Sequence, residues 1–317
     1  MTLPLLELTT ASPAEVLVVL QRHGAALVRD ARVPVARSAL ALADAAAFFA
    51  LPAPAKAAVG IAASPHFRGY SEMHNERDWR EQIHFGSERP AVAAAAPFWR
   101  LQGPNLWPVD PVWRARLLEW LHVVEQAGRT MLAKVAAALG LAGDAWLGDD
   151  PYLLMKLIAY HPQPAGGAKR QGVAAHLDFS LLTLTLQDDV GGLEVQGPDG
   201  RWCAVPCVPG AWLVTIGELL AFVTGQRLLA TPHRVVNPST QRSRYSIPVF
   251  VNPSLTTVLC APSSSSTLAP RRGQHVHAVL EPGAPTRTLP FGAAEWRRKG
   301  ENVWCEGCHA QRVTGPM

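Results

Sequence analysis

The sequence predicts a mainly β protein whose core strands are flanked by helices. Three runs in the second half carry the apolar and alternating pattern typical of strands, at residues 181–186, 192–196 and 211–216. Turn-forming residues at 188–192 and 198–200 separate these runs. Residues 110–140 carry apolar side chains near a 3.6-residue spacing, which predicts one long helix lying against the outside of the strands.

The N-terminal part predicts short strands alternating with helices. An opening strand at 3–8 leads to a helix in which Ser12 is the N-cap and Pro13 the first helical residue. Beyond it the pattern predicts a strand at 25–29, a helix at 35–49 and a short helix through Ala57. Residues 64–103 show little periodicity, and such long polar segments are usually mobile or functional.

Further along, residues 152–160 form a strong strand candidate, and residues 217–222 predict a short helical turn. After Pro262 the signal fades, with a flexible loop expected at 263–267 and a closing helix at 291–299. We therefore expect a single catalytic domain over 1–317. It would divide into a helical N-terminal portion, a core and a tail, at 1–150, 151–262 and 263–317.

Composition excludes several classes of protein. The hydrophobic content of 48% is ample for a core, and the net charge of +4 with no Lys/Arg run gives nucleic-acid or membrane-surface binding little support. No apolar stretch approaches the roughly 20 residues of a membrane span, and no signal peptide is visible. Five irregularly spaced cysteines fit reduced thiols in the cytoplasm better than a disulfide framework.

Two histidines and one carboxylate form the most informative pattern in the chain. His176 and Asp178 are two residues apart, so in a strand their side chains would point to one face. His233 follows after a separation long enough for several strands. Two His and one carboxylate are the ligand set that leaves open positions on octahedral Fe(II), so these residues predict a metal site.

A candidate site for an organic acid lies downstream of His233. In a strand, Arg244 and Ser246 would lie side by side on one face. An arginine fork binds a carboxylate through two parallel hydrogen bonds, and a neighbouring hydroxyl can add a third.

Together these motifs resemble the isopenicillin N synthase-like branch of the Fe(II)/2-oxoglutarate-dependent dioxygenases. The resemblance covers most of the chain. It is carried by His176-Leu177-Asp178, 187–195, 232–235 and Arg244-Tyr245-Ser246, and upstream by 3–8, Gly69-Tyr70, 78–81 and 103–108.

The resemblance implies a distorted double-stranded β-helix, or jelly roll, with N-terminal helices and one long supporting helix. It implies Fe(II) on His176, Asp178 and His233, with the far carboxylate of 2-oxoglutarate on Arg244 and Ser246. The implied activity is oxidation of a small-molecule substrate by O2, by hydroxylation, desaturation or cyclisation, in specialised metabolism. We expect a monomer or weak homodimer without nucleic-acid or membrane partners.

Three alternatives stay open at this point. The first is an oxidase of the same fold that needs no keto acid, since such relatives keep the Arg-x-Ser pair for another carboxylate. The second is an activity like that of the ethylene-forming enzyme. The third is a ligand-binding relative without turnover.

The resemblance also suggests residues for cosubstrate and substrate. Many plant members carry an asparagine where this chain has Ala159, so either Tyr160 or His161 is expected to help hold the organic acid. The segment 64–103 becomes the rim of the active site, or else a solvated loop. Its substrate candidates are Arg68, Tyr70, Arg80 and Glu81, and its histidines His66, His74 and His84 are possible substrate contacts rather than metal ligands.

Two further motifs are set aside. Cys305-Glu306-Gly307-Cys308-His309 matches the pattern of c-type haem attachment, but that attachment belongs to exported proteins. A zinc site would need further ligands. The pair His275 and His277 has no carboxylate at a matching spacing, so we expect both at the surface.

Overall fold

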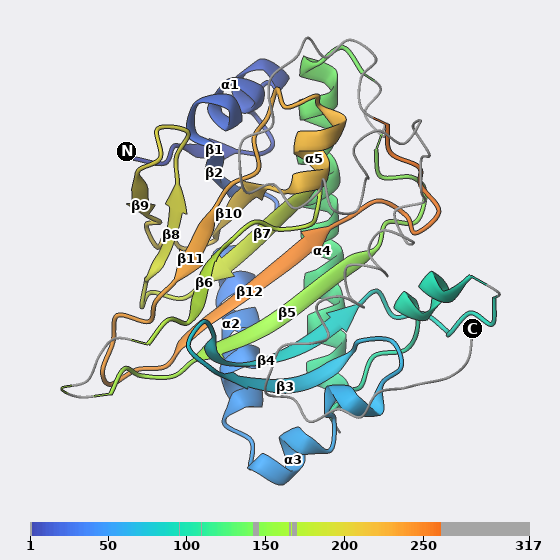
Figure 1. The fold of residues 1–317 in the computed structure, drawn as a ribbon, viewed down its shortest axis with the longest axis vertical. Coiled ribbons are helices and arrows are strands. Elements are labelled where there is room, and N and C mark those ends of the chain that lie inside the picture. The colour runs from blue at the N-terminus through green and yellow to red at the C-terminus, as the bar shows by residue number, and fades with distance from the viewer. Residues whose placement is uncertain are drawn as a thin grey trace.

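The computed structural model describes residues 2–94, 96–108, 110–141, 146–164, 166 and 170–260. Within this part of the chain the strands form one eight-stranded and one four-stranded sheet (Figure 1). The larger sheet contains, in spatial order, β1 (Leu5–Glu7), β2 (Ala25–Arg29), β10 (Ala211–Ile216), β7 (Leu182–Gln187), β12 (Arg244–Val251), β5 (Leu153–Tyr160), β4 (Trp79–Gly86) and β3 (Gly69–His74). The smaller sheet contains β6 (Val173–His176), β11 (His233–Val235), β8 (Leu193–Gln196) and β9 (Trp202–Ala204).

Neighbouring strands pair antiparallel except for β1 and β2, which are parallel. The helices are α1 (Pro13–His23), α2 (Val35–Phe49), α3 (Ala53–Ala57), α4 (Pro111–Ala138) and α5 (Glu218–Val223), with single turns of 3₁₀ helix at Ile61–Ala63 and Pro97–Leu101. The predicted mainly β class with flanking helices is confirmed, and two antiparallel sheets agree with the predicted jelly roll.

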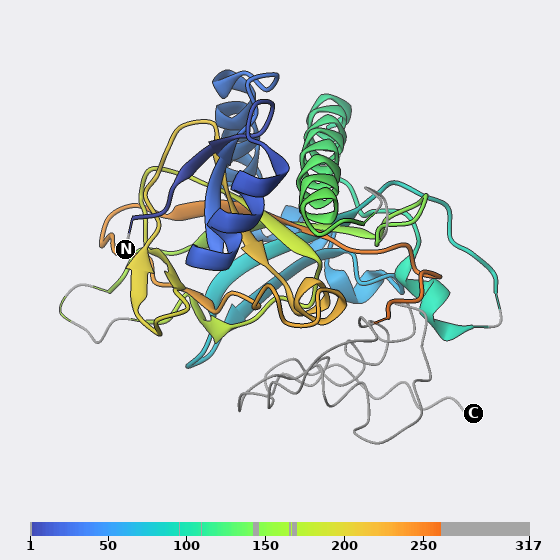
Figure 2. The same cartoon turned by 90° about the horizontal axis from the view of Figure 1, so that it is seen from above.

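One face of the larger sheet packs in the main core, and the other lines a cavity. On one face, buried apolar side chains such as Met155, Leu157 and Val249 belong to the main core, which also contains residues of α2 and α4. Figure 2 shows the long helix α4, in green, standing on one side of the sheet. The alternate residues Leu154, Ile158 and others of these strands point to the opposite face, where they line a cavity.

Local sequence explains where the helices begin. Ser12 and Glu15 form a capping box, in which each side chain bonds to the other's backbone N–H. The carboxylate of Asp110 accepts hydrogen bonds from the backbone N–H groups of Val112 and Trp113 and so caps α4. The helices predicted from Pro13 and over 110–140 are confirmed within two residues at their described ends.

Residues 64–103 show little periodicity in the sequence but form regular strands. This segment contains β3 and β4, which extend the larger sheet beyond β5. Their cavity-facing positions hold polar residues such as Arg80, Gln82 and His84, so the apolar alternation that identifies a strand is missing. The strands could be recognised only from their pairing, β4 with β5 and β3 with β4.

Some predictions lie outside the described residues: the loop at 263–267, the helix at 291–299, His275 and His277, and the motif from Cys305 to His309. Across the part of the chain that is described, no helix combines the length and apolar character needed to cross a membrane.

Candidate metal centre and its cavity

His176, Asp178 and His233 meet at one point of the smaller sheet. His176 ends β6 and His233 begins β11, and the two are direct partners across this antiparallel strand pair. One ligand atom from each of the three residues lies within 4.8 Å of the others. Asp178 is not in the strand as expected, because β6 stops at His176, yet its carboxylate still reaches both imidazoles.

Backbone carbonyls fix the tautomer of both histidines. His176 Nδ1 lies 2.9 Å from the carbonyl oxygen of Ala174, and His233 Nδ1 lies 3.0 Å from that of Thr231. A carbonyl oxygen can only accept, so each Nδ1 carries a proton, and in the neutral form of each imidazole Nε2 then keeps its lone pair. The two Nε2 atoms face the Asp178 carboxylate at 3.6 Å each, and the carbonyls behind the rings are the orienting groups typical of metal-bound histidines.

The charge state of the three residues also suits a cation. Burial raises the pKa of Asp178, but the imidazoles of His233 and His176 outweigh it and hold that pKa below its usual range. Burial lowers the pKa of His233, which favours the neutral imidazole. Asp178 is buried, and its Oδ2 has no hydrogen-bond partner among the described residues. This donor set of two imidazoles and one carboxylate fits Fe(II).

Arg244 stands at the start of β12 with its guanidinium fully buried. Its Nε donates to the carbonyl oxygen of Gly191 at 2.6 Å and its Nη2 to Oε1 of Gln187 at 2.9 Å. Its Nη1 has no partner among the described residues. Burying a guanidinium without a carboxylate partner has a high free-energy cost, so this position suits an anionic ligand.

The candidate metal ligands and Arg244 line one cavity of about 970 Å³. Its lining combines residues of both sheets, including all three candidate metal ligands together with Arg244 and Ser246. Arg244 and Ser246 therefore do face the same side of β12, as their two-residue spacing predicts. Tyr160 also lines the cavity, and its ring centre lies 4.9 Å from the guanidinium carbon of Arg244.

His161 is placed differently from Tyr160. It is absent from the cavity lining, and its Nε2 lies 3.0 Å from the Glu81 carboxylate. Glu81 is buried on the helix side of β4, where it also contacts Lys56 and accepts a hydrogen bond from the Tyr70 hydroxyl at 2.6 Å. The predicted substrate candidates Glu81 and Tyr70 thus belong to a buried ionic network outside the cavity.

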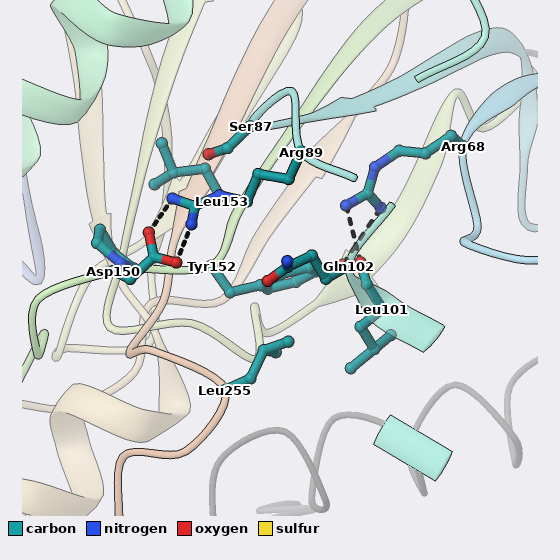
Figure 3. A pocket seen from close by; sticks show the side chains of 10 residues that line it. Arg68, Ser87, Arg89, Leu101, Gln102, Asp150, Tyr152, Leu153 and Leu255 are labelled. Carbon is teal, nitrogen blue, oxygen red and sulfur yellow. Dashed lines mark hydrogen bonds and ion pairs between the residues drawn. The ribbon is translucent and has the colours of Figure 1, made fainter. Parts of the chain in front are cut away.

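Of the remaining substrate candidates, Arg80 lines the cavity and pairs with Asp78 at 3.0 Å. Arg68 instead lines a separate small pocket of about 20 Å³ (Figure 3). There its guanidinium donates to the carbonyl oxygens of His66 and Leu101, at 3.0 Å each. The cavity beside the candidate metal centre does not include Arg68.

The three histidines of the segment 64–103 lie in different surroundings. His84 lines the cavity, whereas His66 and His74 do not. His66 Nδ1 bonds to the carbonyl oxygen of Arg100, and His74 packs against the ring of Trp79.

Several cavity residues were missed by the sequence analysis, above all Lys156 on β5 and Gln82 on β4. A signal for Lys156 existed, because it is the one charged residue in the otherwise apolar run of β5. Its meaning depends on which face of the strand lines the cavity, and the sequence does not report that.

Known families match both halves of the described chain. The model of the 2OG-Fe(II) oxygenase superfamily matches residues 150–253, which include every candidate metal ligand. The N-terminal model of the non-haem dioxygenase in morphine synthesis matches residues 9–110.

Similar proteins carry related descriptions. The 2-oxoglutarate-Fe(II) type oxidoreductase hxnY of Emericella nidulans is 32% identical over 223 residues, covering 64% of this chain and 63% of the relative. A 2-oxoglutarate-dependent dioxygenase of Didymella fabae is 32% identical over 227 residues, covering 65% of this chain and 69% of the relative. The aligned region thus falls short of two thirds of the first relative's length.

A solved structure shares the fold. A Neurospora crassa protein, crystallised at full length in complex with alpha-KG and thymine, superimposes with a TM-score of 0.76 at 20% identity. The superposition covers 95% of this chain and 97% of that one, so the likeness extends over nearly the whole of both.

Proposed function

The chain belongs to the 2OG-Fe(II) oxygenase superfamily, and we propose that it oxidises a small-molecule substrate with Fe(II), 2-oxoglutarate and O2. The observation that carries the proposal is the meeting of His176, Asp178 and His233 at the wall of a cavity that also contains Arg244. A set of two histidines and one carboxylate beside a buried, partly unpaired guanidinium offers one place for the metal and another for a dicarboxylic acid.

In this proposal Nε2 of His176, Nε2 of His233 and the Asp178 carboxylate hold the metal. The carbonyl oxygens of Ala174 and Thr231 keep both imidazoles in the tautomer that can bind it. Bound Fe(II) would supply O2 activation coupled to oxidative decarboxylation of 2-oxoglutarate, with succinate and CO2 as products. The protein's own part is to position the reactants and to exclude water.

Arg244 and Ser246 receive the far carboxylate of 2-oxoglutarate in this proposal. Nη1 of Arg244 donates a charge-assisted hydrogen bond, while Gly191 and Gln187 keep the guanidinium plane fixed. Tyr160 rather than His161 is the neighbouring aromatic residue, because Tyr160 lies in the cavity beside Arg244. A cytoplasmic location and a role in specialised metabolism are part of the same proposal.

Anaerobic reconstitution tests this proposal. Purified protein is mixed with Fe(II) under argon, 2-oxoglutarate is added, and the weak visible charge-transfer band of a chelated keto acid is recorded. Air is then admitted and succinate is assayed. A band followed by succinate is the expected result. Fe(II) binding with neither band nor succinate would contradict the use of 2-oxoglutarate and would favour a keto-acid-independent oxidase.

A further inference from the structure

We propose that the substrate oxidised at this centre is a small organic acid, and that Lys156 binds its carboxylate. The inference rests on the proposed function, because it assumes that the metal and 2-oxoglutarate occupy the cavity. It adds the chemical class of the substrate and the residue that recognises it.

Lys156 is the one charged residue of a strand that is otherwise apolar. It lies on β5, whose other residues are all buried and uncharged, and it is partly exposed to the cavity. The residues two positions away on the same face are Leu154 and Ile158, both apolar. An ammonium group that faces a cavity can donate charge-assisted hydrogen bonds to an anion that enters it, so the position of Lys156 favours an anionic ligand.

Lys156 lies too far from Arg244 for both to bind the same carboxylate. Arg244 is directly opposite Tyr160 across the β5–β12 pair, and Lys156 precedes Tyr160 by four residues. At roughly 3.3 Å per residue these positions are about 13 Å apart along the strand. The cavity therefore offers two cationic positions, of which Arg244 is already assigned to 2-oxoglutarate.

The register connects Lys156 to the metal end of the cavity. The hydroxyl of Thr183 shares a hydrogen bond with the hydroxyl of Ser180, two residues after Asp178, and Thr183 is directly opposite Phe250 across the β7–β12 pair. The Nζ atom of Lys156 lies 5.2 Å from the ring centre of Phe250. The step from β7 over β12 to β5 is two strand spacings, about 10 Å. A small molecule can thus have its oxidised carbon near the metal and its carboxylate at Lys156.

The charges around the cavity support an additional anion. Among its described lining residues, the cationic side chains are Arg77, Arg80, Lys156 and Arg244, and the carboxylates are Glu76, Asp78 and Asp178. The double charges of Fe(II) and 2-oxoglutarate offset one another. Loading therefore leaves the described lining with one more cation than carboxylate, which favours a substrate with one carboxylate.

Neighbouring residues complete the proposed subsite. His84 is directly opposite Lys156 across the β4–β5 pair and also lines the cavity, so its imidazole can supply a second donor. The ring of Phe250 provides an apolar surface between Lys156 and the metal end. The subsite therefore suits an acid with an apolar body.

The test compares acids with their neutral amides. The full chain is loaded with redox-inert Zn(II) and 2-oxoglutarate, and ligand-detected NMR measures binding of phenylacetate, benzoate and hexanoate and of the three matched amides. The variants are Lys156→Met, Lys156→Arg and, as a remote control, exposed Arg201→Gln. Thermal melting checks that each variant is folded, and a separate titration measures 2-oxoglutarate.

We expect at least one acid to bind about tenfold or more tighter than its amide, as for a hydrogen bond between charged groups. Lys156→Met should abolish that preference, while Lys156→Arg and Arg201→Gln should keep it. Equal binding of acids and amides, no binding of any acid, or a preference that survives in folded Lys156→Met would overturn the inference. Failure of the proposed function would appear separately, as absent 2-oxoglutarate binding or absent succinate formation with Fe(II).

Discussion

Oε1 of Gln187 accepts a hydrogen bond from Nη2 of Arg244 at 2.9 Å, which links β7 to β12 beside the cavity that Arg244 lines. Gln187 is the direct partner of Ser246 in this strand pair, so the glutamine reaches Arg244 diagonally. Together with the carbonyl oxygen of Gly191 it holds two of the guanidinium nitrogens and leaves Nη1 for a ligand. The position of the cationic group is therefore set before any ligand binds.

This relationship predicts a graded loss of 2-oxoglutarate affinity. Gln187→Leu removes one hydrogen bond that orients the guanidinium and should raise the 2-oxoglutarate concentration needed for half-maximal succinate formation by about tenfold. Arg244→Met removes the charge itself and should raise it by about a hundredfold or more. Titration of 2-oxoglutarate in the succinate assay measures both.

Arg242→Met is the matched control for these variants. Arg242 lies two residues from Arg244 but is exposed and pairs with Asp189 at 2.6 Å. Exposed ion pairs contribute little, so neither stability nor 2-oxoglutarate affinity should change appreciably. An unchanged affinity in Arg244→Met would assign the guanidinium to some other anion.

Removal of the Asp178 carboxylate should abolish metal binding. Asp178→Ala deletes one of three candidate ligands, and the affinity for Fe(II) should fall by about a hundredfold or more, so that desalting removes the metal. Asp189→Ala removes an exposed carboxylate nearby in sequence and should retain metal like the wild type. Iron content by atomic absorption separates the outcomes, and full iron content in Asp178→Ala would exclude the triad.

The sequence allowed the buried strands and the candidate ligands to be predicted because both depend on residue type and short spacing. β2, β10 and β5 are apolar runs, and Arg244 with Ser246 follows the two-residue rule within one strand. The structure brings the three candidate ligands together as their spacing suggested.

Features set by pairing between distant strands could not be predicted. β4 alternates Arg80, Gln82 and His84 toward the cavity with Glu81 and Ile83 toward the helices, so polar residues fall on both faces. This pattern resembles a loop until the strand is placed beside β5. The same pairing removes Glu81 from the substrate candidates that line the cavity and adds Lys156.

The buried carboxylate of Glu81 should make stability depend on pH. Burial raises its pKa, but hydrogen bonds from His161, Lys56 and Tyr70 outweigh burial and lower the pKa from 4.5 to about 2. A carboxyl group with a depressed pKa in the folded state stabilises fully above pH 4.5 and loses that contribution as the pH falls toward 2. The shift corresponds to about 3 kcal/mol.

Glu81→Gln should therefore lower the free energy of unfolding by about 2–3 kcal/mol at pH 7 and by only about 1 kcal/mol at pH 3. Glu72→Gln is the control, because Glu72 accepts a hydrogen bond from the same Tyr70 hydroxyl but its side chain is half-exposed. That control should lose less than about 1 kcal/mol. Urea unfolding at both pH values measures the difference, and an equal loss at pH 3 and pH 7 would contradict the assignment.

Gly192 should tolerate no side chain. Its φ is +86°, and an added Cβ would overlap the carbonyl oxygen of Val236. The backbone N–H of Val236 also donates a hydrogen bond to the carbonyl oxygen of Gly192, at 2.9 Å. Gly192→Ala must therefore separate the chain before β8 from the chain after β11, next to the Gly191 carbonyl that orients Arg244. We expect a loss of about 2–4 kcal/mol in unfolding free energy together with weaker 2-oxoglutarate binding.

Gly200→Ala isolates the contribution of backbone conformation from that of the overlap. Gly200 has a similar φ of +78°, but no described atom lies within 4 Å of the position of its Cβ. Its replacement should cost only about 1 kcal/mol, from the left-handed backbone alone, and should leave 2-oxoglutarate binding unchanged. If both variants lose the same stability, close approach of Val236 contributes nothing and the cradle around Arg244 does not depend on Gly192.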